Sequence, residues 1–276
     1  MTGPASLIAL DALAERIPDG ALLAVPKDES GVAMAASRAL VRRAVKELHL
    51  LCVPTSGMQA DMLIGAGCVG TVECGAVSLD EFGYAPCFRR AAETGAIRVL
   101  DSTCPAIYAA LQASEKGQPF APLRGVIGSD VQRHRADWKV IQNPMAEGED
   151  PVLILPAIRP DIALFHAPLA DVHGNVWVGN RRELVIMAHA AAATLATVEE
   201  IADINLAADE RYAAGTISAL YVDALAEAEG GARPLGLHGR YGRDDGALRA
   251  YAEAARSEDG FQSWLDRHVL SGREAA

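Results

Sequence analysis

The sequence has few cysteines and few aromatic residues, and it lacks the common nucleotide-binding and metalloprotease motifs. Five cysteines occur among 276 residues, and aromatic residues make up 5% of the chain. No CxxC pair and no Cys/His spacing typical of a zinc site is present, so we expect no metal centre. No GxGxxG follows the first apolar run, and GxxxxGKS/T, GxSxG and HExxH are all absent. These absences argue against the common classes of enzyme that act on nucleotide phosphates.

Basic residues are also in deficit, with 25 Lys and Arg against 36 Asp and Glu and a formal net charge of -11. Nucleic-acid binding depends on clustered Lys and Arg, so DNA and RNA are excluded as partners. A single anionic small molecule could still bind in a local basic pocket.

Long apolar runs are missing too, because no uncharged stretch is long enough to span a bilayer. Residues 1–20 lack the basic start of a signal peptide and have the pattern of an amphipathic helix. We therefore expect a cytoplasmic protein without a membrane segment. Its cysteines are predicted to be free thiols in the core, with Cys104 as the exception.

Short apolar runs that alternate with helical patterns dominate what is present, and half of the residues are apolar. The strand-like runs are Ala21–Val25, Leu48–Val53, Val69–Val77, Ile97–Leu100, Leu123–Ile127, Pro151–Leu155, Ile162–His166, Val176–Val178 and Thr194–Val198. The helical patterns are Ser30–Val45, Pro105–Glu115, Arg182–Ala193 and Asp245–Leu270, the last broken at Gly260. Continuous apolar runs are typical of parallel strands that helices cover on both faces. The sequence thus predicts an α/β fold with an open, mostly parallel sheet, as one domain over residues 1–276, with Gly128–Trp138 as a mobile loop or small flap.

Two polar residues within the apolar runs have both a structural and a chemical interpretation. His166 ends a strand at the expected carboxyl edge of the sheet, where ligands bind in open α/β folds, although a structural role is the favoured interpretation. Glu73 precedes Cys74-Gly75 and could act as a nucleophile towards an acyl group. Because Glu73 lies within a strand-like run, a pairing or sheet-edge role is the favoured interpretation.

Several segments occur in the order found in one enzyme family. They are Asp61–Gly65 (DMLIG), Gln118–Pro122 (QPFAP), Ile141–Pro144 (IQNP), Arg159–His166 (RPDIALFH), Ala170-Asp171 with Gly174-Asn175, and Thr197–Ile201 (TVEEI). Together they resemble the α subunits of class I CoA-transferases, in particular that of glutaconate CoA-transferase. The likeness covers nearly the whole chain.

The resemblance implies a division of labour between two subunits. In such enzymes a β-subunit glutamate attacks the acyl-CoA thioester, and CoA is then passed to a carboxylic acid. The corresponding turn in this sequence is Pro54-Thr55-Ser56-Gly57, in which Thr55 stands where the glutamate would be. We therefore expect an α subunit that carries no catalytic nucleophile, is inactive alone, and uses no cofactor besides the CoA thioester substrate.

The resemblance also suggests which residues face the substrate. Many α subunits carry Gly-Gly-Phe after the first strand, whereas this chain has Pro26-Lys27-Asp28, and proline has no amide hydrogen to donate. Lys27 could offer its ammonium group instead. The candidate substrate-binding residues are Lys27, Ser56, Gly57, Ser78, His166, Asp171 and Asn175. Asp171 and Asn175 have a second interpretation, in which their side chains only fix the turn around Gly174.

Two other functions remain open from the sequence. Some relatives hydrolyse CoA-linked ring compounds, and Val77–Asp80 resembles them too. That branch carries a glutamate near the position of Asp101–Cys104, and this chain has none there. A non-catalytic ligand-binding protein on the same fold is the other alternative.

Overall fold

The computed structural model describes residues 5–271, and its centre is a parallel sheet of eight strands. The strands lie in the order β1 (Ser6–Leu7), β17 (Ala224–Glu227), β14 (Ala193–Val198), β11 (Ile162–Ala167), β2 (Leu22–Pro26), β3 (Leu48–Val53), β5 (Val69–Cys74) and β7 (Arg98–Asp101). All of the paired neighbours run in the same direction. The expected parallel α/β sheet is confirmed.

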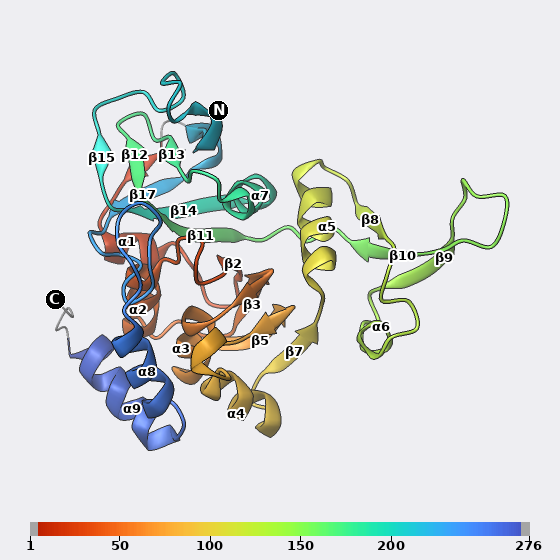
Figure 1. The fold of residues 1–276 in the computed structure, drawn as a ribbon, viewed down its shortest axis with the longest axis horizontal. Coiled ribbons are helices and arrows are strands. Elements are labelled where there is room, and N and C mark those ends of the chain that lie inside the picture. Colours follow the sequence, from red (N-terminus) through yellow and green to blue (C-terminus); the bar gives the residue numbers. More distant parts are fainter. Residues whose placement is uncertain (1–4, 272–276) are drawn as a thin grey trace.

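Helices cover both faces of this sheet (Figure 1). On one face lie α1 (Leu10–Glu15), α2 (Met34–Arg42), α3 (Met58–Gly65), α4 (Pro86–Thr94), α8 (Asp245–Ala254) and α9 (Glu258–Leu265). On the other face lie α5 (Cys104–Glu115) and α7 (Arg182–Ala190). Successive strand residues point to opposite faces, so Leu50 packs in the first core and Leu51 in the second. This explains why the strands are apolar without interruption.

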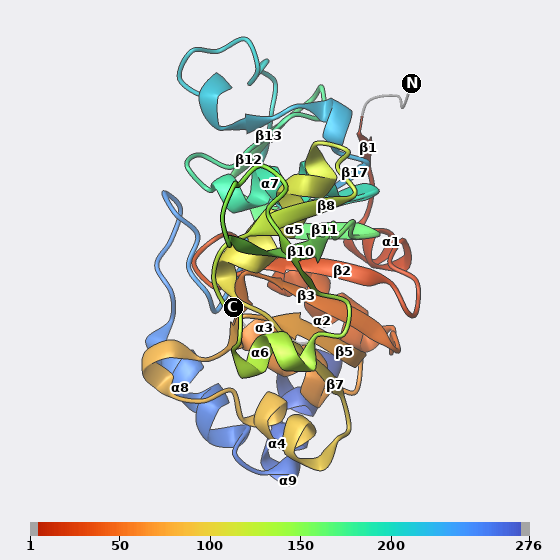
Figure 2. The same cartoon turned by 90° about the vertical axis from the view of Figure 1, so that its right-hand side faces the viewer.

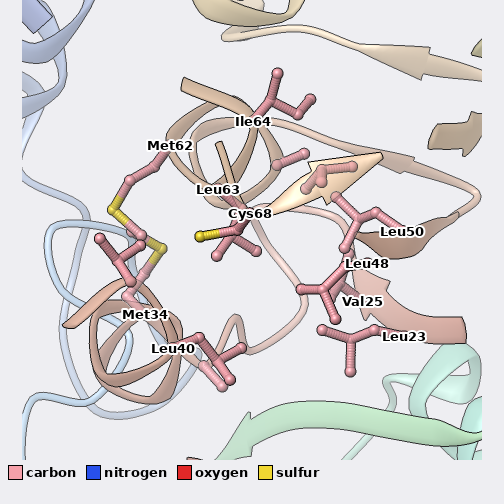
Figure 3. Packing of buried hydrophobic residues seen from close by; sticks show 14 of the residues in the cluster. Leu23, Val25, Met34, Leu40, Leu48, Leu50, Met62, Leu63, Ile64 and Cys68 are labelled. Carbon is pink, nitrogen blue, oxygen red and sulfur yellow. The ribbon is translucent and has the colours of Figure 1, made fainter. Parts of the chain in front are cut away.

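The first core is made of aliphatic side chains from neighbouring elements. Figure 3 shows Met34 of α2 and Met62 of α3 directed toward each other, with Leu40 of α2 and with Leu48 and Leu50 of β3 in the same core. All five are fully buried. Cysteines contribute to this core as well, and four of the five are buried free thiols, whereas Cys104 is exposed. Both parts of the cysteine prediction are confirmed.

A small sheet at one end of the molecule carries the turn with Asp171 and Asn175. It contains β15 (Ile201–Ala202), β12 (Leu169–Asp171), β13 (Val176–Trp177) and β16 (Thr216–Ile217). In Figures 1 and 2 this sheet lies at the opposite end from α8 and α9. A two-stranded pair, β4 (Thr55–Ser56) with β6 (Ala76–Val77), joins the turns that follow β3 and β5.

An arm projects from α5, to the right in Figure 1 and in front of the main sheet in Figure 2. It consists of β8 (Phe120–Leu123), α6 (Asp130–His134), β9 (Lys139–Gln142) and β10 (Pro151–Pro156), with β10 central and antiparallel to both neighbours. The strand expected at Leu123–Ile127 is wrong, because the backbone turns there at Gly125 and Val126, which have positive φ. The expected flap at Gly128–Trp138 is part of this larger arm.

The C-terminal helices break at a different residue from the one expected. The chain leaves α8 after Ala254 and restarts at Ser257, whose side chain accepts a hydrogen bond from Gly260 N at 3.1 Å. Gly260 therefore lies inside α9 rather than between two helices. The second helix begins because Ser257 caps it, whereas we attributed the break in the helical pattern to Gly260.

A buried ion pair attaches the arm to the main sheet. Arg135, which is 5% exposed, lies 2.8 Å from Glu73 of β5 and 2.8 Å from Asp137. Its guanidinium also donates to the carbonyl of Asp101 at the end of β7 and lies over the Trp138 ring. Burial raises the pKa of Glu73, and the charge of Arg135 opposes that rise. The favoured pairing role of Glu73 is confirmed.

Arg135→Met should destabilise the protein by about 3–5 kcal/mol, because it leaves a buried carboxylate without its cation. Arg133→Met is the matched control, since Arg133 lies only two residues before Arg135 but pairs with Asp130 at the surface and should change stability little. Urea unfolding measures both. Adding Glu73→Gln to Arg135→Met should recover part of the loss, and equal effects of the two arginine variants would contradict the assignment.

Candidate functional site

The carboxyl ends of the strands gather the loops that carry most of the predicted substrate-binding residues. Thr55-Ser56 pairs with Ala76-Val77, and the amide of Ser78 donates to the carbonyl of Ser56 at 3.0 Å. The turn after β3 and the turn after β5 are thereby joined. In open α/β sheets this edge is where ligands bind.

Ser56 is the most unusual residue of this edge. Its side chain is 3% exposed, and its Oγ has no hydrogen-bond partner among the described residues. A buried hydroxyl without a partner costs free energy, so such a group usually bonds to an ordered water, a ligand or another chain. The neighbouring Thr55 is half-buried.

Asp28 fixes this turn to the loop after β2. Its Oδ1 accepts from Gly57 N and its Oδ2 from Met58 N, each at 3.1 Å, at the start of α3. Burial raises the pKa of Asp28 to about 7, and these amides oppose the rise. The adjacent Lys27 lies 3.7 Å from Glu29 and is half-exposed.

A pocket of about 210 Å³ opens beside Asp28. Its apolar wall is formed by Leu79, Phe82, Leu235, Leu237 and Leu248. Its charged or titratable lining residues are Asp28, Glu29, Asp80, Arg181, His238, Tyr241 and Arg243. Arg243 is already paired with Glu81 and Asp245, whereas no side-chain partner of Arg181 occurs among the described residues. The pocket can therefore hold a small, partly apolar ligand with one polar group.

One side of this pocket is a loop that Glu199 holds in place. The Glu199 carboxylate accepts hydrogen bonds from Tyr241 Oη at 2.6 Å, Gly230 N at 2.9 Å and Gly231 N at 3.1 Å, and it lies 2.6 Å from His166 Nε2. Burial raises the pKa of Glu199, but the hydrogen bonds from His166, Tyr241 and Gly230 outweigh it and bring the pKa to about 2. The charged form of Glu199 thus anchors the loop.

Asp171 and Asn175 form a second, separate network of hydrogen bonds. The Asp171 carboxylate accepts from the amides of His173, Asn175 and Leu206 and from the side chain of Asn175. Asn175 in turn accepts from Ala219 N at 2.9 Å. These contacts fix the turn between β12 and β13 and hold it to two later segments, as the second interpretation of this pair expects.

The structure thus brings some of the predicted residues together and separates others. Lys27, Ser56, Gly57 and Ser78 lie on joined loops at the sheet edge. His166 is fully buried, between Thr197 and Glu199, and the contacts of Asp171 and Asn175 are internal. A substrate contact of any of these seven residues stays a prediction.

The pocket residues Asp28, Asp80, Arg181 and Tyr241 were not foreseen. Asp28 belongs to the Pro26-Lys27-Asp28 segment, where we considered only the lysine because of its charge. An Asp directly before a helix is a sequence signal for capping of the helix amides. That signal does not apply to Asp28, because the helix that it caps begins thirty residues later. The remaining three come from loops whose proximity no local pattern encodes.

Comparison with known proteins agrees with this architecture. The family model for coenzyme A transferase matches residues 7–228. The chain belongs to the coenzyme A transferase family. Within the family it is 32% identical to the α subunit of 3-oxoadipate CoA-transferase from Pseudomonas knackmussii, over 98% of this chain and 95% of that one.

Two further relatives match this member of the CoA-transferase family over most of its length. It is 34% identical to the cholesterol ring-cleaving hydrolase IpdA subunit of Mycobacterium tuberculosis, over 88% of this chain and 85% of that one. The crystal structure of glutaconate CoA-transferase from Acidaminococcus fermentans matches with a TM-score of 0.86 and 25% identity, over 97% of this chain and 89% of that one. The predicted resemblance to CoA-transferase α subunits is confirmed.

Glu199→Gln should lower stability at neutral pH, because the amide puts a donor where the carboxylate accepts. The pKa of Glu199 is about 2 in the folded protein and ordinarily 4.5, so its contribution is complete above pH 4.5 and is lost as pH falls toward 2. The wild type should therefore exceed the variant by up to about 3 kcal/mol at pH 6 and by less at pH 3. Urea unfolding at both pH values measures this difference, and a gap that does not change with pH would contradict it.

Proposed function

We propose that this protein is the α subunit of a heteromeric class I CoA-transferase, which moves CoA between an acyl-CoA and a carboxylic acid. The observation that carries the proposal is the turn after β3. It has the Ser-Gly of the family's active-site turn and a buried, unpartnered Ser56 hydroxyl, but Thr55 in place of the nucleophilic carboxylate. A separate β subunit would supply that glutamate.

The reaction expected for such a pair divides into two exchanges. The glutamate carboxylate adds to the thioester carbonyl and the carbon–sulfur bond breaks. CoA departs as the thiolate, and an acyl–glutamyl anhydride remains. The thiolate then adds to the glutamyl carbonyl and releases the first carboxylate, which gives a glutamyl-CoA thioester. The acceptor acid reverses these steps. A thiolate is a good leaving group, so the protein has mainly to position the reactants and stabilise each oxyanion.

The contribution of this chain is a wall of the site rather than a nucleophile. The proposed substrate contacts are Lys27, Ser56, Gly57, Ser78, His166, Asp171 and Asn175. The Ser56 hydroxyl has a hydrogen to donate to a ligand or to the partner protein, and the pocket beside Asp28 has room for a short acyl group. We infer no cofactor beyond the CoA thioester, which is a substrate.

The rest of the proposal concerns the form of the protein. Residues 1–276 would make up one α-subunit-like domain, and the protein would work in the cytoplasm as a hetero-oligomer. Among residues 5–271, no helix has the length and apolar character needed to cross a membrane. The names of the relatives, which include the α subunits of two CoA-transferases, support a partner subunit.

Hydrolysis of a CoA-linked ring compound is the alternative within the family, because a ring-cleaving hydrolase subunit is among the relatives. The segment at which we expect a glutamate in that branch is Asp101–Cys104. Asp101 ends β7 with an exposed side chain, and Cys104 begins α5. This alternative has no better support than transfer.

Transfer should require both subunits. The chain would be co-expressed with a β subunit encoded beside its gene and assayed with a panel of dicarboxylic and short-chain acyl-CoAs, while free CoA is followed in parallel. We expect transfer by the complex, none by either chain alone, and none after the partner's glutamate is replaced. Release of free CoA without transfer would support hydrolysis, and a chain that neither pairs nor reacts would support a ligand-binding role.

Ser56→Ala should separate function from stability. Since the Ser56 hydroxyl has no partner among the described residues, its removal should leave the free energy of unfolding unchanged or raise it slightly. Loss of one hydrogen bond to the ligand should lower kcat/KM about tenfold. Assays of the complex and urea unfolding of the chain measure the two effects.

The matched control is Ser37→Ala. Ser37 is equally buried, but its hydroxyl donates to Ala33 O and accepts from Gln59. This variant should lose about 1–2 kcal/mol of stability and keep its kcat/KM. If Ser56→Ala instead behaved like Ser37→Ala, the functional assignment of Ser56 would fail.

A further inference from the structure

Gly57 is the point at which three loops of the sheet edge meet. A Cβ atom built on Gly57 would overlap the carboxylate of Asp28 and would lie 2.7 Å from the carbonyl oxygen of Ser78. The loop after β2, the turn after β3 and the turn after β5 are therefore in contact there. The absence of a side chain at residue 57 allows Asp28 to approach two successive amides.

The two hydrogen bonds of Asp28 fix the turn in two directions. One carboxylate oxygen accepts from the amide of Gly57 and the other from the amide of Met58, so both the position and the orientation of the turn are constrained relative to the loop after β2. Hydrogen bonds to an ionised carboxylate are about twice as strong as those to a neutral acceptor. The strength of these two hydrogen bonds therefore depends on the charge state of Asp28.

Acidic groups surround Asp28 from several elements. After burial, the charges of Asp80 and Glu29 raise the pKa of Asp28, while the amides of Met58 and Gly57 lower it. The basic or titratable side chains that line the same pocket are Arg181, His238, Tyr241 and Arg243. Arg243 is held by Glu81 and Asp245, and Lys27 by Glu29. The balance leaves Asp28 able to change charge near neutral pH.

We propose that Asp28 is a positioning residue of the substrate site, whose ionised carboxylate holds the Ser56-Gly57 turn in the geometry that the substrate needs. This role rests on the proposed function, because it concerns the same turn. The chain has Asp28 within the segment that replaces the Gly-Gly-Phe of many α subunits. In this protein a carboxylate from that segment accepts hydrogen bonds from the amides of Gly57 and Met58.

The proposal gives transfer a specific dependence on pH. Below about pH 7 the Asp28 carboxyl gains a proton, its bonds to the two amides weaken, and the turn loosens. The kcat/KM of the α–β complex should therefore rise with pH along a limb with a midpoint near 7. Asp28→Asn, which is neutral at every pH, should lack this limb and remain at the level that the wild type shows at low pH.

Asp80→Asn provides a control that changes the limb without removing it. Asp80 makes no hydrogen bond to the turn around Gly57, but its negative charge raises the pKa of Asp28. This variant should move the limb to lower pH and keep its shape. A structural defect alone would lower kcat/KM at all pH values and would not shift a midpoint.

A measurement that needs no enzymatic activity tests the clamp itself, which consists of the hydrogen bonds from the amides of Gly57 and Met58 to Asp28. The amide resonances of Gly57 and Met58 in the full-length chain should titrate by NMR with a midpoint near 7, and this titration should be absent in Asp28→Asn. We expect the same midpoint, within the effect of the bound partner, in the pH–rate profile of the complex.

Each outcome decides the proposal. Amides that titrate near pH 4, or that titrate identically in Asp28→Asn, would show that Asp28 does not hold the turn in this way. Amides that titrate near pH 7 beside a transfer rate without the limb would show a clamp that does not position the substrate. If the wild-type complex transferred no CoA at any pH, the proposed function would fall and the positioning role with it, although the NMR titration would still report the clamp.

Discussion

The site depends first on one constraint, the common direction of the eight central strands. Parallel strands place all of their carboxyl ends at one edge, so residues from distant parts of the sequence meet there. The turn after β3 touches the loop after β2 and the turn after β5, and the loop that follows β17 borders the same pocket. An antiparallel arrangement would send alternate loops to the opposite edge and would leave no such cluster.

Buried and half-buried carboxylates hold loops and helix starts once the sheet has brought them together. Asp28 takes the first amides of α3, Asp61 takes the amide of Phe88 at the start of α4, and Glu199 takes those of Gly230 and Gly231. Amide groups at loop ends and helix starts otherwise lack partners, and a carboxylate satisfies two or more of them. Some of the acidic side chains of this chain therefore bind backbone amides within the molecule. For this reason the net charge alone does not describe the charge at the candidate site.

The same arrangement explains how an incomplete site can be stable. Most polar groups at the edge find partners within the chain, so the isolated protein can fold without its ligand. Ser56 differs, because its buried hydroxyl lacks a partner among the described residues. The Oε1 of Gln59, in the helix that follows the same turn, is also buried without a partner among the described residues.

The sequence by itself determined the fold class, most strand positions and the family, because apolar periodicity and segment order are local properties of the chain. The resemblance also predicts that the turn at Thr55–Gly57 belongs to the site and carries no nucleophile, and this stays a prediction. Only the tertiary structure decided that β10 lies in an antiparallel arm, that Arg135 neutralises Glu73, and that Asp28 rather than Lys27 contacts the turn. These pairings join residues that are tens of positions apart, and a hydrogen bond or ion pair depends on distance in space, which spacing along the chain does not encode.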